Sequence, residues 1–545
     1  AAAELTGSDT ASAVRELSDA ALLARPDRAR LAPRHALLSA AVVEVSDPVS
    51  VTEAHAGVAA VLEASGEASA SVAAAGHWAE AGRDAEELRA TLVAAPVAED
   101  LADFDAAATL WSRAYTLTQA FPDAAAAGGH SLLSVVVSAL RALNWAGRNE
   151  DAHVLAEDAL KRLSPVEETP LGGSLRYWVG LFRSMRDLMA GTEMLREAER
   201  VLSAHPPTSH LVASLVRLGQ LEEACGRPEP ALDLLARAVE ASREAAVLQD
   251  EAHATVALAH VMFGLGRADE AIGMVADLGR RPEIADDVRA QGLLAVLESD
   301  FLLQTGQLAK ARTVAWDAYQ LMSREGHRGT WEVSILRCNA VEAELELGRS
   351  VHAWTLVEPV TTGRTPNIDT TGDHLLRALA DLSTGRVTDA VHRVQLVSAV
   401  SRATAFTEDI RITAAALATI LRWAGHPQQA LEAVAQDLAL LAGTDQERRC
   451  GELLACGAAA AADLAAAARA RQDVDAEAQA LEKLQGLVQW VADCREDPFQ
   501  PVLDGGREDA DGLQWVAELS RARGPGDPDL WHRAAQEWEG QQRVH

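Results

Sequence analysis

The hexapeptide G-R-A-D-E-A at residues 266–271 is one of seven copies of a pattern in which four residues separate a Gly from an Ala. A run of helix-forming residues precedes each Gly, and another follows each Ala. A Gly at the end of a helix can adopt the left-handed conformation that other residues avoid. A small Ala early in the next helix lets two antiparallel helices approach closely. The other copies are G-R-N-E-D-A (147–152), G-R-P-E-P-A (226–231), G-Q-L-A-K-A (306–311), G-R-S-V-H-A (348–353), G-R-V-T-D-A (385–390) and G-H-P-Q-Q-A (425–430).

The copies recur at a nearly constant period. From Gly226 to Gly425 the successive spacings are 40, 40, 42, 37 and 40 residues, and the gap from Gly147 to Gly226 is 79 residues. We place a degenerate copy in that gap at Gly191, with Arg196 where the Ala is expected. A fixed period of this size is typical of a solenoid built from helical hairpins. The Gly-then-Ala corner is that of tetratricopeptide (TPR) repeats, so the sequence predicts an all-α, TPR-like helical-hairpin solenoid.

The composition agrees with this fold and narrows the function. The 545 residues are too many for one globular core, whereas stacked repeats each pack only on their neighbours. The net charge is −31, which argues against direct contact with a nucleic acid backbone. Five Cys without a C-x-x-C pair fit a reducing cytoplasm, so we expect a cytoplasmic protein. No apolar run is predicted to span a membrane, and the N-terminus lacks the pattern of a signal peptide.

Motifs that would indicate catalysis or a cofactor are missing from the sequence. It contains no G-x-x-x-x-G-K-[ST], G-x-G-x-x-G, H-E-x-x-H or G-x-S-x-G. His253 and His260 are seven residues apart and share a helix face, but two His residues alone make a poor metal site. We therefore predict no enzyme activity, no metal and no cofactor in this chain.

One predicted hairpin shows how the helices should pack. Val256, Ala259, Met262 and Phe263 follow helical spacing and form one predicted buried stripe before the corner at Gly266. After the corner, the predicted partner stripe is Ala271, Ile272 and Val275.

The N-terminal part carries no repeat corner but does carry a resemblance. Residues 11–45 read as a helix, a Pro-Asp turn with a β wing, and a second helix, and residues 50–65 as a third helix. The runs R-H-A-L-L (34–38) and A-V-V-E (41–44) resemble the end of the winged helix in large ATP-binding LuxR-type (LAL, MalT-like) transcriptional regulators. His77-Trp78 and the later Trp111 to Ala114 resemble the first repeats of that family. The stretch W-H-R-A-A-Q-E-W-E (531–539) resembles the helix that opens its final repeats.

The resemblance implies a domain order and one site residue. Residues 1–62 would be the end of the winged-helix segment, 63–495 the TPR-like repeats, and 496–545 an acidic loop and the start of C-terminal repeats. His35 would contact the phosphate of a nucleotide in the intact protein, although a buried helix-capping role is an equal alternative. ATP or ADP would then be bound only by an ATPase domain outside this chain.

The preferred function is accordingly a sensing arm. The concave face would bind a small-molecule inducer or a protein segment and thereby control an ATPase switch in a LuxR-type regulator. The alternatives, in order, are a free-standing TPR-like protein-interaction scaffold and an enzyme built on an α-solenoid. The sequence leaves the oligomeric state open.

Overall fold

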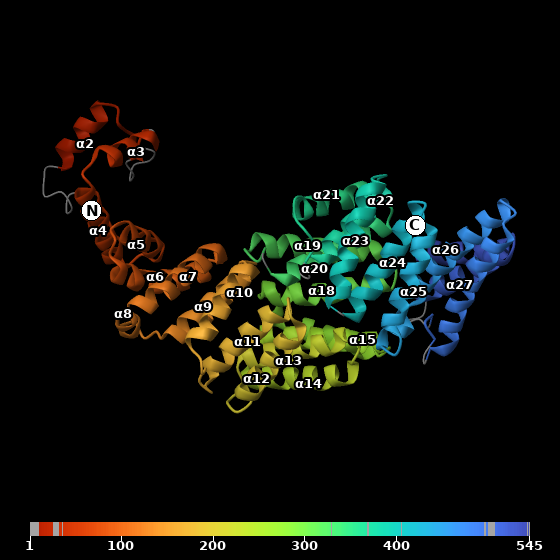
Figure 1. Cartoon of the computed structure of the whole chain (residues 1–545). Coiled ribbons are helices and arrows are strands. Elements are labelled where there is room, and N and C mark those ends of the chain that lie inside the picture. The colour runs from red at the N-terminus through yellow and green to blue at the C-terminus, as the bar shows by residue number, and fades with distance from the viewer. Residues whose placement is uncertain are drawn as a thin grey trace. The chain divides into compact units, whose positions relative to one another are not determined.

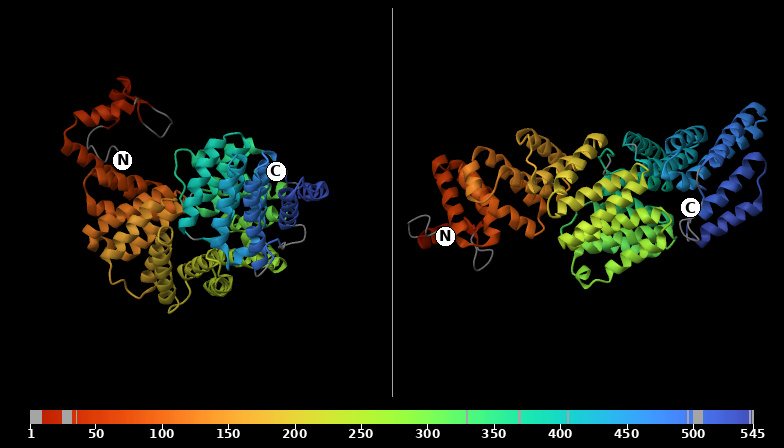
Figure 2. Two further views of the ribbon diagram at one scale, coloured as in Figure 1. Left: turned by 45° about the vertical axis from the view of Figure 1, so that its right-hand side comes forward. Right: turned by 90° about the horizontal axis from the view of Figure 1, so that it is seen from below.

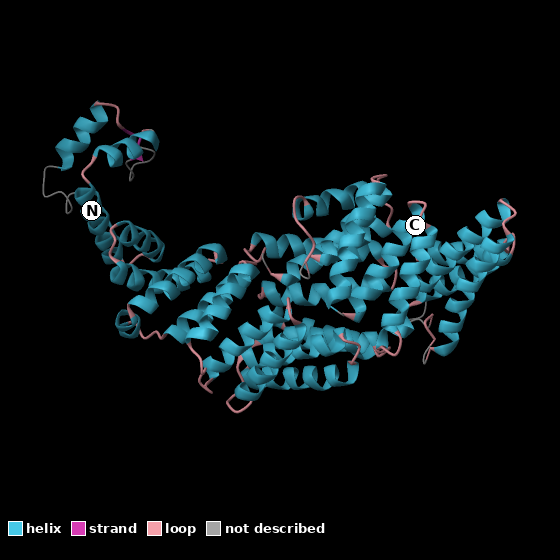
Figure 3. Ribbon diagram, in the orientation of Figure 1, coloured by secondary structure: helices cyan, strands magenta, loops and turns pink. Residues whose placement is uncertain are grey.

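The computed structural model describes residues 10–24, 32–34, 36–328, 330–367, 370–404, 406–494, 497–499, 507–541 and 543. Nearly all of the described chain is helical, as Figures 1 and 3 show. It divides into two compact units, Ala1–Pro165 and Val166–His545, which are described separately. The boundaries at residues 62 and 495 that the resemblance implies stay predictions.

Unit 1 begins with the small elements that the sequence predicts. Helix α2 is followed by a pair of antiparallel two-residue strands in which Leu23 lies opposite Pro33, and then by α3 and α4. The Asp47 side chain accepts hydrogen bonds from the backbone N–H groups of Val49 and Ser50 and so caps α4. The bounds are α2 Thr10–Asp19, β1 Leu23–Ala24, β2 Ala32–Pro33, α3 Ala36–Val45, α4 Pro48–Ser65, α5 Ala68–Glu80, α6 Asp84–Asp100, α7 Phe104–Ala120, α8 Pro122–Ala127, α9 Leu132–Trp145 and α10 Asn149–Arg162.

Unit 2 consists of helices that run from yellow to blue in Figure 1. The bounds are α11 Pro170–Ser184, α12 Leu188–Leu202, α13 Ser209–Ala224, α14 Pro228–Ala245, α15 Leu248–Gly264, α16 Ala268–Gly279, α17 Pro282–Ala285, α18 Val288–Gln304, α19 Leu308–Arg324, α20 Trp331–Glu346, α21 Ser350–Thr361, α22 Thr371–Ser383, α23 Val387–Thr404, α24 Thr407–Trp423, α25 Pro427–Leu441, η1 Asp445–Arg449, α26 Gly451–Ala470, α27 Val474–Asp493, α28 Arg507–Arg523 and α29 Pro528–Gly540.

The seven predicted corners all form as expected. Each corner Gly has a positive φ, between 69° at Gly147 and 84° at Gly425. The residue after the Gly donates its backbone N–H to the carbonyl five residues earlier, as Arg227 does to Glu222 at 2.9 Å, which closes a Schellman motif. Each signature Ala is fully buried, because the two helices of its hairpin pack against each other at that position. These residues are Ala152, Ala231, Ala271, Ala311, Ala353, Ala390 and Ala430.

The prediction of a degenerate corner at Gly191 is wrong. Gly191 lies inside α12, and the chain turns between Ser184 and Leu188 instead. A Cβ on Gly191 would lie 2.3 Å from the backbone N of Ser184 on the preceding helix. Gly191 therefore takes the place of the signature Ala, and Arg186 takes the place of the corner Gly. Arg186 is 39 residues after Gly147 and 40 before Gly226, which restores the period.

The hairpins of unit 2 stack in the order of the sequence (Figure 2). In each hairpin we call the helix before the corner the first helix and the one after it the second helix. Every first helix contacts the first helix of the next hairpin. Each second helix from α12 to α25 contacts its own first helix and also the first helix of the next hairpin. The first helices are α11, α13, α15, α18, α20, α22, α24 and α26. This layered array confirms the predicted fold: the chain is a TPR-like helical-repeat scaffold.

The array curves until distant first helices meet. Helix α13 contacts α24, and the Thr407 hydroxyl donates a hydrogen bond of 3.0 Å to the backbone carbonyl of Ala224. Since both α13 and α24 are first helices, the first-helix layer lies on the inside of the curve. Arg543, which follows α29, donates a hydrogen bond of 3.0 Å to the carbonyl of Leu303 on α18.

Helix α26 corrects one expectation about membranes. Its 20 residues, Gly451–Ala470, are long and apolar enough to cross a bilayer by length and composition, with a mean hydropathy of 1.4. In this fold 61% of that segment is buried, because α26 packs against α24, α25, α27 and α28. The Ala-rich sequence of α26 thus serves here as the core of the last hairpins.

Candidate functional site

A row of polar and aromatic side chains follows the first-helix layer of unit 2. Each member lies on a first helix, and neighbouring members belong to the same or consecutive hairpins. We call this set the inner polar row; it consists of Tyr177 on α11, His210 on α13, Asp250 and His253 on α15, Arg289 on α18 and Glu332 on α20.

The aromatic end of the row is formed by α11 and α13. The rings of Tyr177 and Trp178 have centroids 4.9 Å apart, and the His210 ring lies 5.5 Å from Tyr177 and 5.7 Å from Trp178. The Ser174 hydroxyl lies 3.0 Å from Nδ1 of His210 and fixes the orientation of that ring. These contacts make a rigid aromatic wall.

The charged end of the row is formed by α15, α18 and α20. Nε of Arg289 donates to Oε1 of Glu332 at 3.1 Å, and Glu332 is 0% exposed. The His253 ring packs on Trp331, with centroids 5.5 Å apart. A carboxylate this deeply buried is retained only because a cation accompanies it.

Burial sets the protonation states along the row. Burial raises the pKa of Tyr177 to about 12 and lowers the pKa of His253 to about 4. Burial also raises the pKa of Asp250. Burial alone would raise the pKa of Glu332, but the charge of Arg289 and the hydrogen bonds to the carboxylate together outweigh it and the pKa is lowered. At neutral pH the row therefore presents a protonated phenol, a neutral imidazole and an ionised glutamate.

Several buried polar atoms in or beside the row have no hydrogen-bond partner among the described residues. They are Nε1 of Trp178, Oδ2 of Asp250, Nε2 of His253 and Oε2 of Glu332. A buried polar atom without a partner costs on the order of 1–3 kcal/mol, and few occur in a folded protein. Four of them lie along one layer, and each would gain a partner if local side-chain movement let a bound molecule reach it.

Other buried charges in the array belong to the fold. Asp381 is 1% exposed and accepts hydrogen bonds from Trp354, Arg386 and Arg377 at 2.8, 2.9 and 3.1 Å. Burial would raise the pKa of Asp381, but these donors lower it. Glu222 and Glu344 pair in the same way with the Arg that follows their own corner Gly. Because their charged partners lie in the same hairpin, these carboxylates stabilise the corners.

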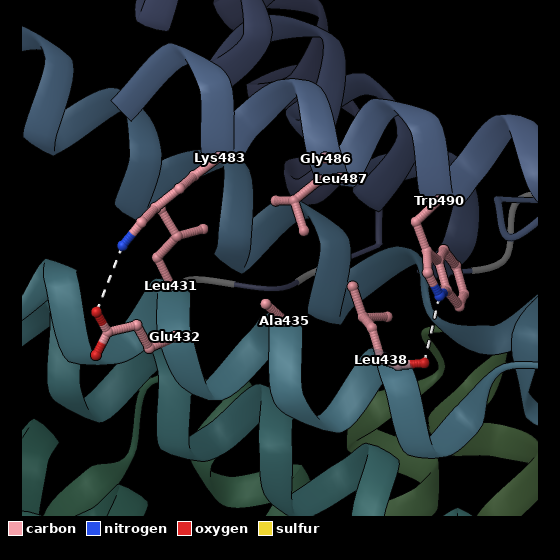
Figure 4. A pocket seen from close by; sticks show the side chains of 8 residues that line it. All are labelled: Leu431, Glu432, Ala435, Leu438, Lys483, Gly486, Leu487 and Trp490. Atoms are coloured by element: carbon pink, nitrogen blue, oxygen red, sulfur yellow. Dashed lines mark hydrogen bonds and ion pairs between the residues drawn. The ribbon is translucent and has the colours of Figure 1, made fainter. Parts of the chain in front are cut away.

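A shallow groove lies between the second helices α25 and α27 (Figure 4). Its volume is about 280 Å³, and its floor is apolar. The Lys483 ammonium lies 3.4 Å from Oε1 of Glu432, and Trp490 donates to the carbonyl of Leu438 at 3.3 Å. Since these polar groups already have partners, the groove offers a ligand mainly apolar contact. The remaining lining residues are Leu431, Ala435, Gly486 and Leu487.

The structure places the residues of the sequence analysis in different situations. His35 lies outside the described residues, so its role at a nucleotide phosphate stays a prediction. His253 and His260 share α15 but have different neighbours: His253 packs on Trp331, whereas Nδ1 of His260 lies 3.9 Å from Oδ2 of Asp300.

The inner polar row was missed from the sequence, although one signal could have found part of it. Asp250, Arg289 and Glu332 lie 16, 17 and 16 residues before their corner glycines. Aligning the repeats on the glycines would have placed these three charges within one residue of the same register of the first helix. Their contacts with each other depend on the stacking.

Comparisons with known proteins concern the fold alone. No protein-family model and no curated protein matches the chain. Among solved structures, a Rap protein complexed with competence and sporulation factor is 12% identical with a TM-score of 0.38 and covers 75% of this chain and 99% of its own. The APC/C heterotetramer Cut9–Hcn1 is 12% identical with a TM-score of 0.43, covering 91% and 98%. A monomeric variant of IFIT1 with m7Gppp-AAAA is 14% identical with a TM-score of 0.34, covering 84% and 90%. These similarities assign no ligand or activity to this chain.

Proposed function

We propose that the first-helix layer of unit 2 binds a protein segment along the inner polar row. The observation that carries this proposal is the set of buried polar atoms that lack a partner within the described chain. A polypeptide segment supplies what they need, because its backbone presents N–H donors and carbonyl acceptors at regular intervals.

The row specifies the chemistry of contact. Backbone or side-chain N–H groups of the segment would donate to Oδ2 of Asp250 and Oε2 of Glu332. A carbonyl of the segment would accept from Nε1 of Trp178. An apolar or aromatic side chain would pack on the wall of Tyr177 and Trp178, where aromatic contacts add to the area buried. Each pairing would remove part of the cost of leaving a polar atom buried without a partner.

Panning of a random 12-residue peptide library against the 545-residue chain tests this proposal. Peptides enriched on the wild-type chain should bind Asp250→Asn and Glu332→Gln at least tenfold more weakly. Asp277→Asn is the matched control, because Asp277 lies on a second helix and its side chain is 72% exposed. Enriched peptides that bind all three variants as well as the wild type would refute the role of the row.

We further infer that this binding surface is the sensing arm of a LuxR-type regulator of the LAL group, with the ligand controlling an ATPase switch. The support is the winged-helix-like stretch at residues 34–44 and the Trp-rich stretch at 531–539. A ligand can bias such a switch only if it binds the two states with different affinity. The alternative is a free-standing protein-interaction scaffold.

Sequencing the gene on both sides of this segment separates the two proposals. A G-x-x-x-x-G-K-[ST] motif upstream and a helix-turn-helix downstream would support the regulator, and their absence from the full reading frame would favour the scaffold. If the ATPase is present, His35→Ala in the intact protein should raise basal activity and weaken nucleotide retention. Unchanged values of both would reject the role of His35.

A further inference from the structure

Three metal-ligating side chains converge where the curve of unit 2 closes. Glu223 is on α13, His260 on α15 and Glu408 on α24, and one ligand atom from each lies within 4.8 Å of the other two. The Thr407–Ala224 hydrogen bond joins the residues next to Glu408 and Glu223. Because this contact holds α24 against α13, the convergence depends on the curvature and is not visible in the sequence.

Further carboxylates surround this group. Oδ2 of Asp300 lies 3.9 Å from Nδ1 of His260, and Asp409 follows Glu408 on the first turn of α24. Four carboxyl groups and one imidazole therefore gather on the inside of the curve.

Two arginines offset part of this charge. Nη1 of Arg449 lies 3.4 Å from Oε1 of Glu408, and Nη2 of Arg411 lies 3.7 Å from the same oxygen. Both are longer than a good charge-assisted hydrogen bond of about 2.8 Å. Glu408 therefore makes only long contacts with these two guanidinium groups.

We propose that Glu223, His260 and Glu408 form a binding site for a divalent transition-metal ion, with water completing its coordination. One imidazole nitrogen with carboxylate oxygens suits Zn²⁺, whose bonds to such ligands are about 2.0–2.2 Å. Ligand atoms around a tetrahedral Zn²⁺ lie about 3.4 Å apart, so these atoms would have to approach each other by up to about 1.4 Å through rotation of the Glu side chains. The side chains of His260 and Glu408 are 38% and 24% exposed, so an ion can enter from solvent.

The bound ion would cross-link helices that are distant in the sequence. It would join α13 and α15 to α24, whose hairpin lies five repeats beyond that of α13 and four beyond that of α15. Closing a loop of this length by metal coordination restricts opening of the curve, and with it access to the first-helix layer. The site is separate from the inner polar row and does not depend on the proposed function.

Zinc titration of the chelator-treated 545-residue chain tests the proposal. Isothermal titration calorimetry with ZnCl₂ should show one equivalent bound, and His260→Asn and Glu408→Gln should each weaken binding at least tenfold. His392→Ala is the matched control, since His392 is exposed on the second helix α23, and it should bind as the wild type does. Hydrogen exchange should also show slower exchange at the start of α24 when Zn²⁺ is added.

The outcomes are distinguishable. Circular dichroism spectra equal to that of the wild type show that the variants are folded, and the isosteric Glu408→Gln is the variant least able to disturb packing. Failure of the folded wild-type chain to bind Zn²⁺ would overturn the proposal. So would Zn²⁺ binding of equal affinity in His260→Asn, Glu408→Gln and the wild type, because the ion would then be held elsewhere, for instance by cysteine.

Discussion

Replacing Gly by Ala at three positions of unit 2 should give three different results, because the same methyl group meets three different surroundings. Gly191 lies inside α12 against the backbone of α11, with Ser184 N and Cα at 2.3 and 2.4 Å from the position of a Cβ. Gly273 lies inside α16 with nothing within 4 Å of that position. Gly385 is a corner residue with φ of +82° and an equally open Cβ position.

The expected changes in stability follow from these surroundings. Gly273→Ala should stabilise α16 by roughly 1 kcal/mol, since Ala favours a helix interior by that amount over Gly. Gly385→Ala should destabilise its corner by about 1–2 kcal/mol, the cost of the left-handed conformation for a residue with a Cβ. Gly191→Ala gains the same helix propensity but overpacks against backbone atoms that cannot rotate away. An overpacking cost of roughly 3 kcal/mol leaves a net loss of about 2 kcal/mol.

Native-state hydrogen exchange is the suitable assay, because a long repeat array does not unfold in a single step. The free energy of opening should fall for amides of α11 and α12 in Gly191→Ala, fall at the α22–α23 corner in Gly385→Ala, and rise in α16 in Gly273→Ala. If Gly191→Ala left the amides of α11 and α12 as protected as in the wild type, the close approach of these helices at Gly191 would be refuted.

Further predictions concern buried charges. Arg289→Met should lower the free energy of unfolding by roughly 3 kcal/mol because it leaves the Glu332 carboxylate buried without its cation, and Glu332→Gln in the same chain should recover part of that loss in urea unfolding. Asp381→Ala should cost a similar amount, roughly 3 kcal/mol, and should also shift the fluorescence of Trp354, which loses its acceptor; an unshifted spectrum would contradict that hydrogen bond. His253 has a pKa of about 4 in the folded chain and about 6.5 when unfolded, so the unfolded chain binds more protons between these values. Stability should therefore fall as the pH decreases from about 6.5 to about 4, and His253→Gln should flatten that part of the curve of urea midpoint against pH.

Much of the fold could be predicted because its signals are local. A left-handed corner selects Gly through its own backbone, and a close helix contact selects Ala at a fixed distance from that corner. Gln472, with φ of 58°, closes the corner between α26 and α27 without a Gly. The buried stripe of Val256, Met262 and Phe263 was likewise confirmed, at 5%, 4% and 2% exposed.

The failures have a common physical cause. Gly191 looked like a corner because Gly serves both left-handed turns and close helix packing, and the residue type does not tell which. Ile272 was expected in the partner stripe but is 41% exposed, because the second helix α16 has a narrow buried face and Ala271 already fills it. The apolar length of α26 suits both a bilayer and a protein core, and only its neighbours show that it packs among helices.

The sequence by itself determined the repeating unit, its period and its corners, since each of these depends on backbone conformation and on contacts between helices adjacent in the chain. Only the tertiary structure decided which side chains meet across the array. Stacking of consecutive first helices assembled the inner polar row, and curvature brought Glu408 to Glu223, 185 residues away. Small rotations between neighbouring hairpins add up over several repeats, and no short stretch of sequence specifies their sum.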